Sequence, residues 1–188
     1  MLLSNVAWKE YVLLRDVLDG PGVHMTFLNG VLELMSPSRE HEMWKKNVAR
    51  IVELYAYKNG IDLRAYGSTT FRREAKDRGA EPDECYVIAK ALGDVPDFVV
   101  EVIHTSPLLN KLEVYAGLAI PEVWIFREGA LSVHSLDRSS GKYVARDASV
   151  FLPELDLAIV ARYVVREDTT DALREFEAAI ATSSAAPR

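Results

Sequence analysis

The sequence predicts one domain of the α/β (α+β) class, with a mixed central sheet flanked by helices. The expected order of elements is helix, hairpin, helix, several strands, helix, strands and a last helix, which is typical of this class. Hydrophobic residues make up 49% of the 188 residues, enough for one core, and no repeat or Gly/Ser-rich linker divides the chain. We expect an N-terminal helix and turn over residues 1–22, a core over 23–157 and a C-terminal helix with a frayed tail over 158–188, all within one domain.

The first third of the chain predicts a helix, a hairpin and a second, longer helix. Residues 8–18 carry apolar side chains at helical intervals and end in a Gly- and Pro-rich turn. A β-hairpin is expected at 25–35, because Asn29-Gly30 lies between two apolar runs. Ser36-Pro37-Ser38 can cap and begin a helix that continues to residue 58, with apolar residues along one face.

Strands dominate the rest of the sequence. A strand is expected at 97–103, and its residues 98–103 are apolar on both faces except for Glu101, as expected of a covered central strand. Arg78-Gly79 is expected to form a loop. The remaining predictions are extended chain at 61–73, strands at 84–88, 123–126, 131–136 and 143–145, helices at 107–118 and 170–181, and a frayed tail at 182–188.

Composition excludes several classes of protein. The chain has 22 basic and 28 acidic residues, a net charge of −6, which argues against coating nucleic acid or anionic membrane by bulk charge. A single cysteine, Cys85, excludes an internal disulfide and any multi-cysteine zinc site. No run of about 18 apolar residues is present, and residues 1–4 lack the pattern of a secretory signal. We therefore expect a cytoplasmic protein without a membrane partner.

Glu101 is the most informative single residue. Strand alternation places residues 99, 101 and 103 on one face and 98, 100 and 102 on the other, and both faces are apolar around Glu101. An ionised carboxylate there is costly unless a cation or a hydrogen-bond donor meets it. The alternatives are an edge position where the strand leaves the core, or an ion pair with a nearby arginine.

Asp83 and Lys111 are candidate site residues because both are expected to lie close to Glu101. Asp83 begins the strand at 84–88 and taken alone is an ordinary turn acid. Two carboxylates from adjacent strand ends suit a hard divalent cation such as Mg²⁺, which prefers oxygen ligands. Lys111, ten residues after Glu101, would lie over the strand end, where it could stabilise charge on phosphate. The plainer interpretation of Lys111 is a solvated helix lysine.

Glu33 and His41 form a further candidate pair. Glu33 lies in the second strand of the predicted hairpin, and His41 falls on the inward face of the long helix near its start. His41 either contacts phosphate or a metal-bound water, or only packs and forms hydrogen bonds. Glu33 is either an outer metal ligand or a solvent-facing residue.

Basic residues gather just before the predicted acidic site. Residues 64–78 hold five bases and two acids, whereas residues 81–101 hold six acids and one base. A positive strand and loop beside a negative pocket would suit a metal site that receives a polyanion. A solvated loop of mixed charge is the other interpretation. The candidate nucleic-acid-binding residues are Arg64, Arg72, Arg73, Lys76 and Arg78.

An ordered set of short motifs resembles the Uma family of restriction-endonuclease-like proteins, which belong to the PD-(D/E)XK nuclease superfamily. The resemblance covers roughly residues 23–136. Its motifs are Leu32-Glu33-Leu34-Met35-Ser36-Pro37-Ser38 followed by His41-Glu42, Gly67-Ser68-Thr69-Thr70-Phe71, Glu81-Pro82-Asp83-Glu84-Cys85, Val99-Val100-Glu101-Val102, Lys111 with Tyr115, and Pro121-Glu122-Val123-Trp124-Ile125.

The resemblance implies a restriction-endonuclease-like sheet with the site at its open end. It implies that Asp83, Glu101 and the backbone carbonyl of Val102 bind Mg²⁺ or Mn²⁺. In the simplest superfamily pattern a lysine stands two residues after the Glu, but this chain has Ile103 there. The Uma-like arrangement draws the lysine from the next helix, which implies Lys111.

Three functions remain open from the sequence. The first is a Mg²⁺-dependent endonuclease that hydrolyses DNA phosphodiester bonds, in which Asp83, Glu101, Lys111, Glu33 and His41 form the site. The second is a catalytically inactive nuclease-fold protein that binds nucleic acid or a protein partner. The third is a metal-dependent hydrolase of a smaller phosphate ester. A homodimer is expected, because nucleases that cut both strands often pair.

Overall fold

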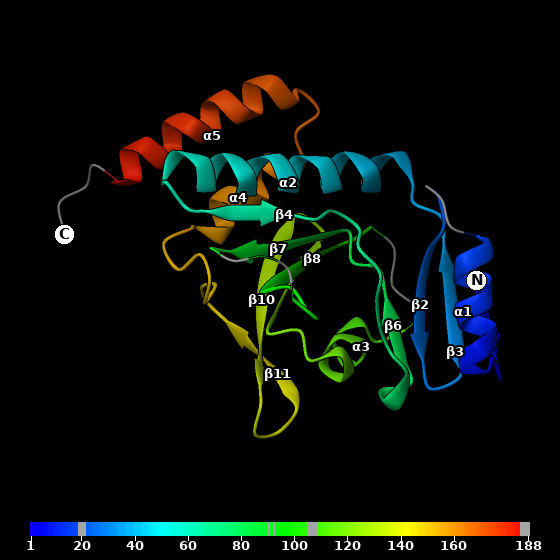
Figure 1. The fold of residues 1–188 in the computed structure, drawn as a ribbon. Helices are drawn as coiled ribbons and strands as arrows, with labels where there is room; N and C mark the ends of the chain where they lie inside the picture. Colours follow the sequence, from blue (N-terminus) through cyan, green and yellow to red (C-terminus); the bar gives the residue numbers. More distant parts are fainter. Residues whose placement is uncertain (19–21, 90, 92, 105–108, 185–188) are drawn as a thin grey trace.

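The computed structural model describes residues 1–18, 22–89, 91, 93–104 and 109–184. It contains two β-sheets and helices that cover them, in a mixed α/β arrangement (Figure 1). The predicted fold class is thus confirmed, although the sequence predicted one central sheet rather than two.

The larger sheet has six strands in the order β11-β10-β9-β8-β7-β4. Only β8 and β9 run parallel to each other, so the sheet is mixed. The strands are β4 (Leu63–Ala65), β7 (Glu84–Ile88), β8 (Phe98–Ile103), β9 (Glu122–Arg127), β10 (Ala130–Asp137) and β11 (Lys142–Arg146). All six residues of β8 are buried, which confirms the covered central strand.

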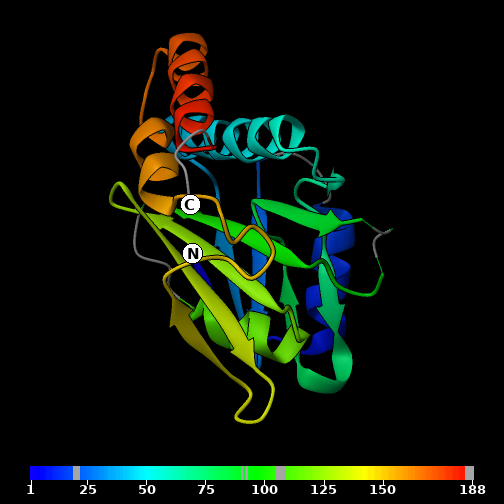
Figure 2. The same cartoon turned by 90° about the vertical axis from the view of Figure 1, so that its left-hand side faces the viewer.

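Helices cover one face of this sheet in two layers. Helices α2 (Arg39–Lys58) and α4 (Leu157–Val164) pack on the sheet, and α5 (Thr169–Ser184) packs on these two helices, farther from the strands (Figure 2). Phe98, Val100 and Val102 face these helices and share a buried cluster with Val48 and Phe176. The Ser38 side chain accepts a hydrogen bond from the His41 backbone at the start of α2, as expected of an N-cap.

The smaller sheet has five strands in the order β1-β3-β2-β6-β5. These strands are β1 (Leu2–Ser4), β2 (His24–Leu28), β3 (Val31–Met35), β5 (Phe71–Arg73) and β6 (Arg78–Ala80). Asn29 and Gly30 both have positive φ angles at the turn between β2 and β3, which confirms the predicted hairpin. Helix α1 (Trp8–Val17) packs on the outer face, where Tyr11 stacks on Phe27.

Helix α3 (Lys111–Leu118) lies where the two sheets meet (Figure 1). Its buried residues Val114 and Tyr115 share one cluster with Val99 of the larger sheet and Leu28 of the smaller one. The first residue of α3 is therefore held close to both sheets.

Several segments differ from the sequence predictions. Strand β1 was not predicted, and α5 continues to Ser184, within the segment predicted to be a frayed tail. Arg78-Gly79 belongs to β6 instead of a loop, because this segment pairs with both β2 and β5. Residues 157–164 form a helix that the sequence did not indicate. The predicted helix at 107–118 is seen from Lys111, and its first two residues lie outside the described part of the chain. None of the helices in the described ranges has both the length and the apolar character needed to cross a bilayer.

Candidate active site

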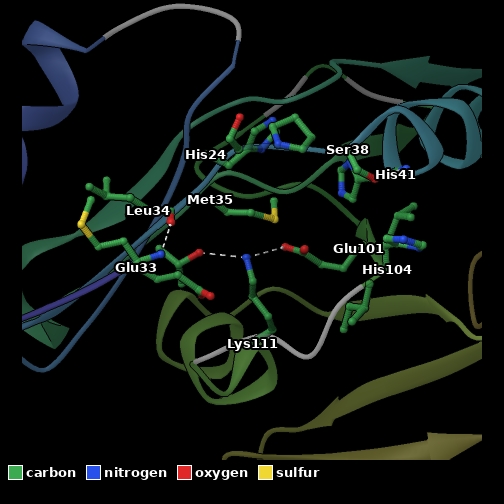
Figure 3. Close-up of a pocket in the computed structure, with 15 residues that line it drawn as sticks. His24, Glu33, Leu34, Met35, Ser38, His41, Glu101, His104 and Lys111 are labelled. Atoms are coloured by element: carbon green, nitrogen blue, oxygen red, sulfur yellow. Dashed lines mark hydrogen bonds and ion pairs between the residues drawn. The ribbon is translucent and has the colours of Figure 1, made fainter.

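A cavity of about 370 Å³ opens between the two sheets and the beginnings of α2 and α3. Residues from both sheets line it, including Thr26 and Glu33 from the smaller sheet and Glu101 and Val102 from the larger one. His41 of α2 and Lys111 of α3 complete the polar lining. The cavity thus gathers ionisable groups from four separate parts of the chain (Figure 3).

Asp83 and Glu101 lie on neighbouring antiparallel strands. The register pairs Glu84 with Val100, so Asp83 at the start of β7 is opposite Glu101 in β8. The carboxylate of Asp83 accepts a hydrogen bond from the Val102 backbone N–H, with Oδ2 2.7 Å from the nitrogen. The two acids that the sequence singled out therefore meet at one end of the larger sheet.

The buried Asp83 carboxylate is stabilised in its ionised form. Burial by itself raises the pKa of Asp83, but the hydrogen bonds from His41 and from the Val102 N–H outweigh it and hold that pKa below its ordinary value. His41 Nε2 lies 3.2 Å from Asp83 Oδ2. Burial lowers the His41 pKa, but the bond to Asp83 more than reverses this and raises it.

Glu101 is held in a different environment. Burial raises its pKa, Lys111 lowers it and the charge of Asp83 raises it again, leaving a pKa above the ordinary value. The Tyr115 hydroxyl donates a hydrogen bond to Glu101 Oε1. Burial and the Glu101 charge together raise the pKa of Tyr115 well above its usual range, so the phenol stays protonated.

Lys111 lies between the two sheets and points into the cavity. Its Nζ is 3.5 Å from Glu101 Oε1 and donates a hydrogen bond of 2.8 Å to the hydroxyl of Thr26. Figure 3 shows the amine directed into the space between the carboxylates of Glu33 and Glu101. Lys111 is only 8% exposed, so the alternative interpretation of a solvated helix lysine is wrong.

The two carboxylates form a donor set that fits a hard divalent ion. The described residues contain no cluster of three or more His, Cys, Asp or Glu side chains arranged around a metal position. Mg²⁺, however, is usually held by one or two protein carboxylates, with waters and substrate oxygens completing its shell. The hydrogen bonds among described residues engage Asp83 Oδ2 and Glu101 Oε1, so Asp83 Oδ1 and Glu101 Oε2 would be the oxygens to contact such an ion.

The predicted nucleic-acid-binding residues lie apart from the cavity, since none of the five lines it. Arg72 and Arg73 are exposed on β5, and Lys76 is exposed in the short 3₁₀ helix that follows (Glu74–Lys76). Arg64 is on β4, at the edge of the larger sheet, with Asp62 3.4 Å away. Arg78 is mostly buried and donates hydrogen bonds to Asn29 and to the backbone oxygen of Lys76.

The structure adds residues that sequence reasoning gave no role. His24 and His104 line the cavity, and His24 has a pKa lowered by burial. Thr26 gave no signal, since threonine is common in strands. Tyr115 could have been found from its spacing, because a residue four positions after Lys111 lies on the same face of a helix.

Comparisons with known proteins identify a shared fold and a family. No curated protein matches the chain. A solved structure from Anabaena variabilis, described as a "putative nuclease belonging to DUF820", is similar to it, with a TM-score of 0.52 and 15% sequence identity. That match covers 76% of this chain and 91% of the other, and at this identity it shows a shared fold. The model of the Uma2 family, described as "Putative restriction endonuclease", matches residues 8–164, and the chain therefore belongs to the Uma2 family.

Proposed function

We propose that this protein is a metal-dependent nuclease that hydrolyses phosphodiester bonds in DNA. The observation that carries the proposal is that Glu101 and Lys111 line one cavity 3.5 Å apart, while the buried Asp83 lies opposite Glu101 and contacts His41 and Val102 of the cavity lining. Membership of a family described as restriction endonucleases supports nuclease function in general.

The residues at and beside the cavity have distinct roles in this proposal. Asp83 and Glu101, with the backbone carbonyl of Val102, hold a Mg²⁺ or Mn²⁺ ion. When bound, such an ion stabilises negative charge on phosphoryl oxygens and helps to activate water. Lys111 directs its positive charge at the phosphate as charge builds up there. Glu33 completes the acidic lining, and His41 orients the Asp83 carboxylate.

The DNA backbone extends beyond the cavity in this proposal. Arg72, Arg73 and Lys76 are exposed basic residues on one segment of the smaller sheet and can neutralise phosphates there. A homodimer would bring two such cavities to the two strands of a duplex.

A second candidate is a nuclease-fold protein that binds nucleic acid or a protein without cutting DNA. The described residues hold no metal cluster of three side chains, and the five basic candidates do not line the cavity. Both observations favour this alternative, so the experiment must separate binding from cleavage.

The test is cleavage of supercoiled plasmid and of single-stranded DNA by the wild type and by Asp83→Asn. We expect cleavage by the wild type only with Mg²⁺ or Mn²⁺, and a loss of at least a hundredfold in the variant. Asp171→Asn, an exposed site on α5, is the matched control and should cut like the wild type. Equal cleavage by wild type and Asp83→Asn would refute the proposal.

Two further outcomes identify the alternatives. DNA binding that persists without cleavage at millimolar Mn²⁺ would establish the binding protein. Hydrolysis of bis(p-nitrophenyl) phosphate without cleavage of DNA would establish a hydrolase of smaller phosphate esters.

A further inference from the structure

Lys111 and Glu101 are close but do not form a tight ion pair. Their nearest atoms, Nζ and Oε1, are 3.5 Å apart, and both side chains are almost fully buried. A charge-assisted N–H···O contact is normally about 2.7–2.9 Å long. Something other than their mutual attraction therefore sets the positions of the amine and the carboxylate.

A hydroxyl group from the smaller sheet holds the amine. Lys111 Nζ donates to Thr26 Oγ1 at 2.8 Å, and Thr26 is 2% exposed. Thr26 is in the middle of β2, paired with Glu33 on one side and Ala80 on the other, so its backbone is fixed by two neighbouring strands. Its branched side chain has few available rotamers, which makes the hydroxyl a rigid acceptor.

A second hydroxyl holds the carboxylate. Tyr115 lies one turn after Lys111 on α3, is fully buried and donates its hydrogen to Glu101 Oε1. The same face of one helix therefore carries both the cation and the donor that contacts its neighbouring anion. Tyr115 and Lys111 both contact Oε1 of Glu101, and the contacts among described residues do not engage Oε2.

We propose that Thr26 and Tyr115 are positioning residues that keep Lys111 and Glu101 from closing into a direct ion pair. In a direct ion pair, the positive charge of Lys111 would offset the negative charge of Glu101, and Glu101 would then bind a divalent cation more weakly. The proposal rests on the proposed function, because it assigns Glu101 to a cation and Lys111 to phosphate. It also gives the smaller sheet a part in the cation site, because Thr26 of that sheet keeps the Lys111 amine away from Glu101.

Paired variants separate positioning from simple structural support. Thr26→Val keeps the shape of the side chain but removes the acceptor, whereas Thr26→Ser keeps the hydroxyl. Thr70→Val is the matched control, because Thr70 also bonds a charged group, Glu81, but does not line the cavity. Tyr115→Phe tests the second hydroxyl, with Tyr143→Phe as its control, since Tyr143 bonds a backbone oxygen outside the cavity.

The first measurement is Mn²⁺ affinity by isothermal titration, with single-turnover DNA cleavage beside it. We expect Thr26→Val and Tyr115→Phe to weaken Mn²⁺ binding roughly ten- to hundredfold, as residues that orient metal ligands do. Thr26→Ser should restore most of the affinity, and both controls should bind like the wild type. A structural role alone would lower thermal stability in Thr26→Val and Thr70→Val alike without this selective loss of affinity.

The second measurement needs no metal. In a crystal structure of metal-free Thr26→Val, we expect Lys111 Nζ within hydrogen-bonding distance of a Glu101 oxygen. Unchanged positions of Nζ and Glu101, or Mn²⁺ affinity within twofold of the wild type, would overturn the proposal. If the wild type neither binds Mn²⁺ nor cuts DNA, the proposed function fails, and the crystal structure alone then decides the positioning role.

Discussion

The imidazole of His41 and the carboxylate of Asp83 form a buried pair, with Nε2 3.2 Å from Oδ2. The pair connects the start of α2 to the residue just before β7, although His41 and Asp83 are 42 positions apart in the sequence. His41 therefore helps to orient a candidate metal ligand, together with the Val102 backbone N–H.

His41→Ala should lower metal-dependent DNA cleavage about ten- to hundredfold, because the Asp83 carboxylate loses one of its two hydrogen-bond donors. Cleavage rates at saturating Mn²⁺ measure the effect. His134→Ala, on β10 outside the cavity, is the control. A His41→Ala protein as active as this control would show that the histidine only packs.

Arg15→Met should destabilise the protein by about 3–5 kcal/mol, because it leaves a buried carboxylate without its cation. Arg15 of α1 forms an ion pair with Glu81, which is 5% exposed and also accepts hydrogen bonds from Thr70 and the Met25 backbone. Urea denaturation gives the free energy of unfolding. Arg174→Met breaks an exposed ion pair and should cost about 0–1 kcal/mol; equal losses in the two variants would contradict this account.

Gly79→Ala should lower the free energy of unfolding by about 1–3 kcal/mol, the usual cost of overpacking. A Cβ atom at Gly79 would collide with the ring and hydroxyl of Tyr11, so α1 could not pack as closely on β6. Gly93→Ala is the matched control, because its Cβ would meet no atom within 4 Å. Indistinguishable unfolding curves for the two variants would disprove this close packing.

The carboxyl of Asp137 should titrate far below the ordinary range. Hydrogen bonds from the Ser139 and Ser140 side chains and the Ser139 backbone lower its pKa from 3.8 to about 2. A lowered pKa in the folded state stabilises the protein above about pH 4, and this contribution is lost as the pH falls toward 2. NMR titration of the carboxyl carbon measures it, and Ser139→Ala should raise the pKa toward 3.8. A wild-type value near 3.8 would contradict the prediction.

The triple substitution of Arg72, Arg73 and Lys76 by Ala should weaken DNA binding and make it less dependent on salt. Each phosphate contact contributes about 0.9 to the slope of log affinity against log salt, so the slope should fall by about 2–3. Fluorescence anisotropy across a salt series measures this slope. An unchanged slope would show that DNA does not cross this part of the smaller sheet.

The sequence singled out the acids of the candidate site, together with His41 and Lys111, but it assigned no role to the hydroxyl groups of Thr26 and Tyr115 that contact Lys111 and Glu101. Glu101 stood out because an ionisable residue interrupts a wholly apolar strand, and Asp83 followed from the neighbouring strand. Thr26 could not be found, because its contact with Lys111 depends on how the second sheet packs against the first.

Secondary structure was likewise predictable where it depends on neighbouring residues in the sequence, but not where it depends on packing against distant segments. The Asn29-Gly30 hairpin depends on local turn chemistry and was predicted correctly. The sequence predicts a loop at Arg78-Gly79 because this segment has no strand pattern of its own, whereas in the structure β2 and β5 pair with it and impose the extended form of β6. Likewise α4 contains several β-branched residues and becomes helical where it packs on α2 and β10.

The site is divided along the chain as well as between the sheets. Thr26, Glu33 and His41 precede the turn at Asn59-Gly60, and Asp83, Glu101 and Lys111 follow it. A polypeptide cut at this turn would yield two fragments, each with half of the site. Under the proposed function, restored DNA cleavage on mixing them would report the reassembly of the protein, which makes this turn a position at which to divide it for a split-protein sensor.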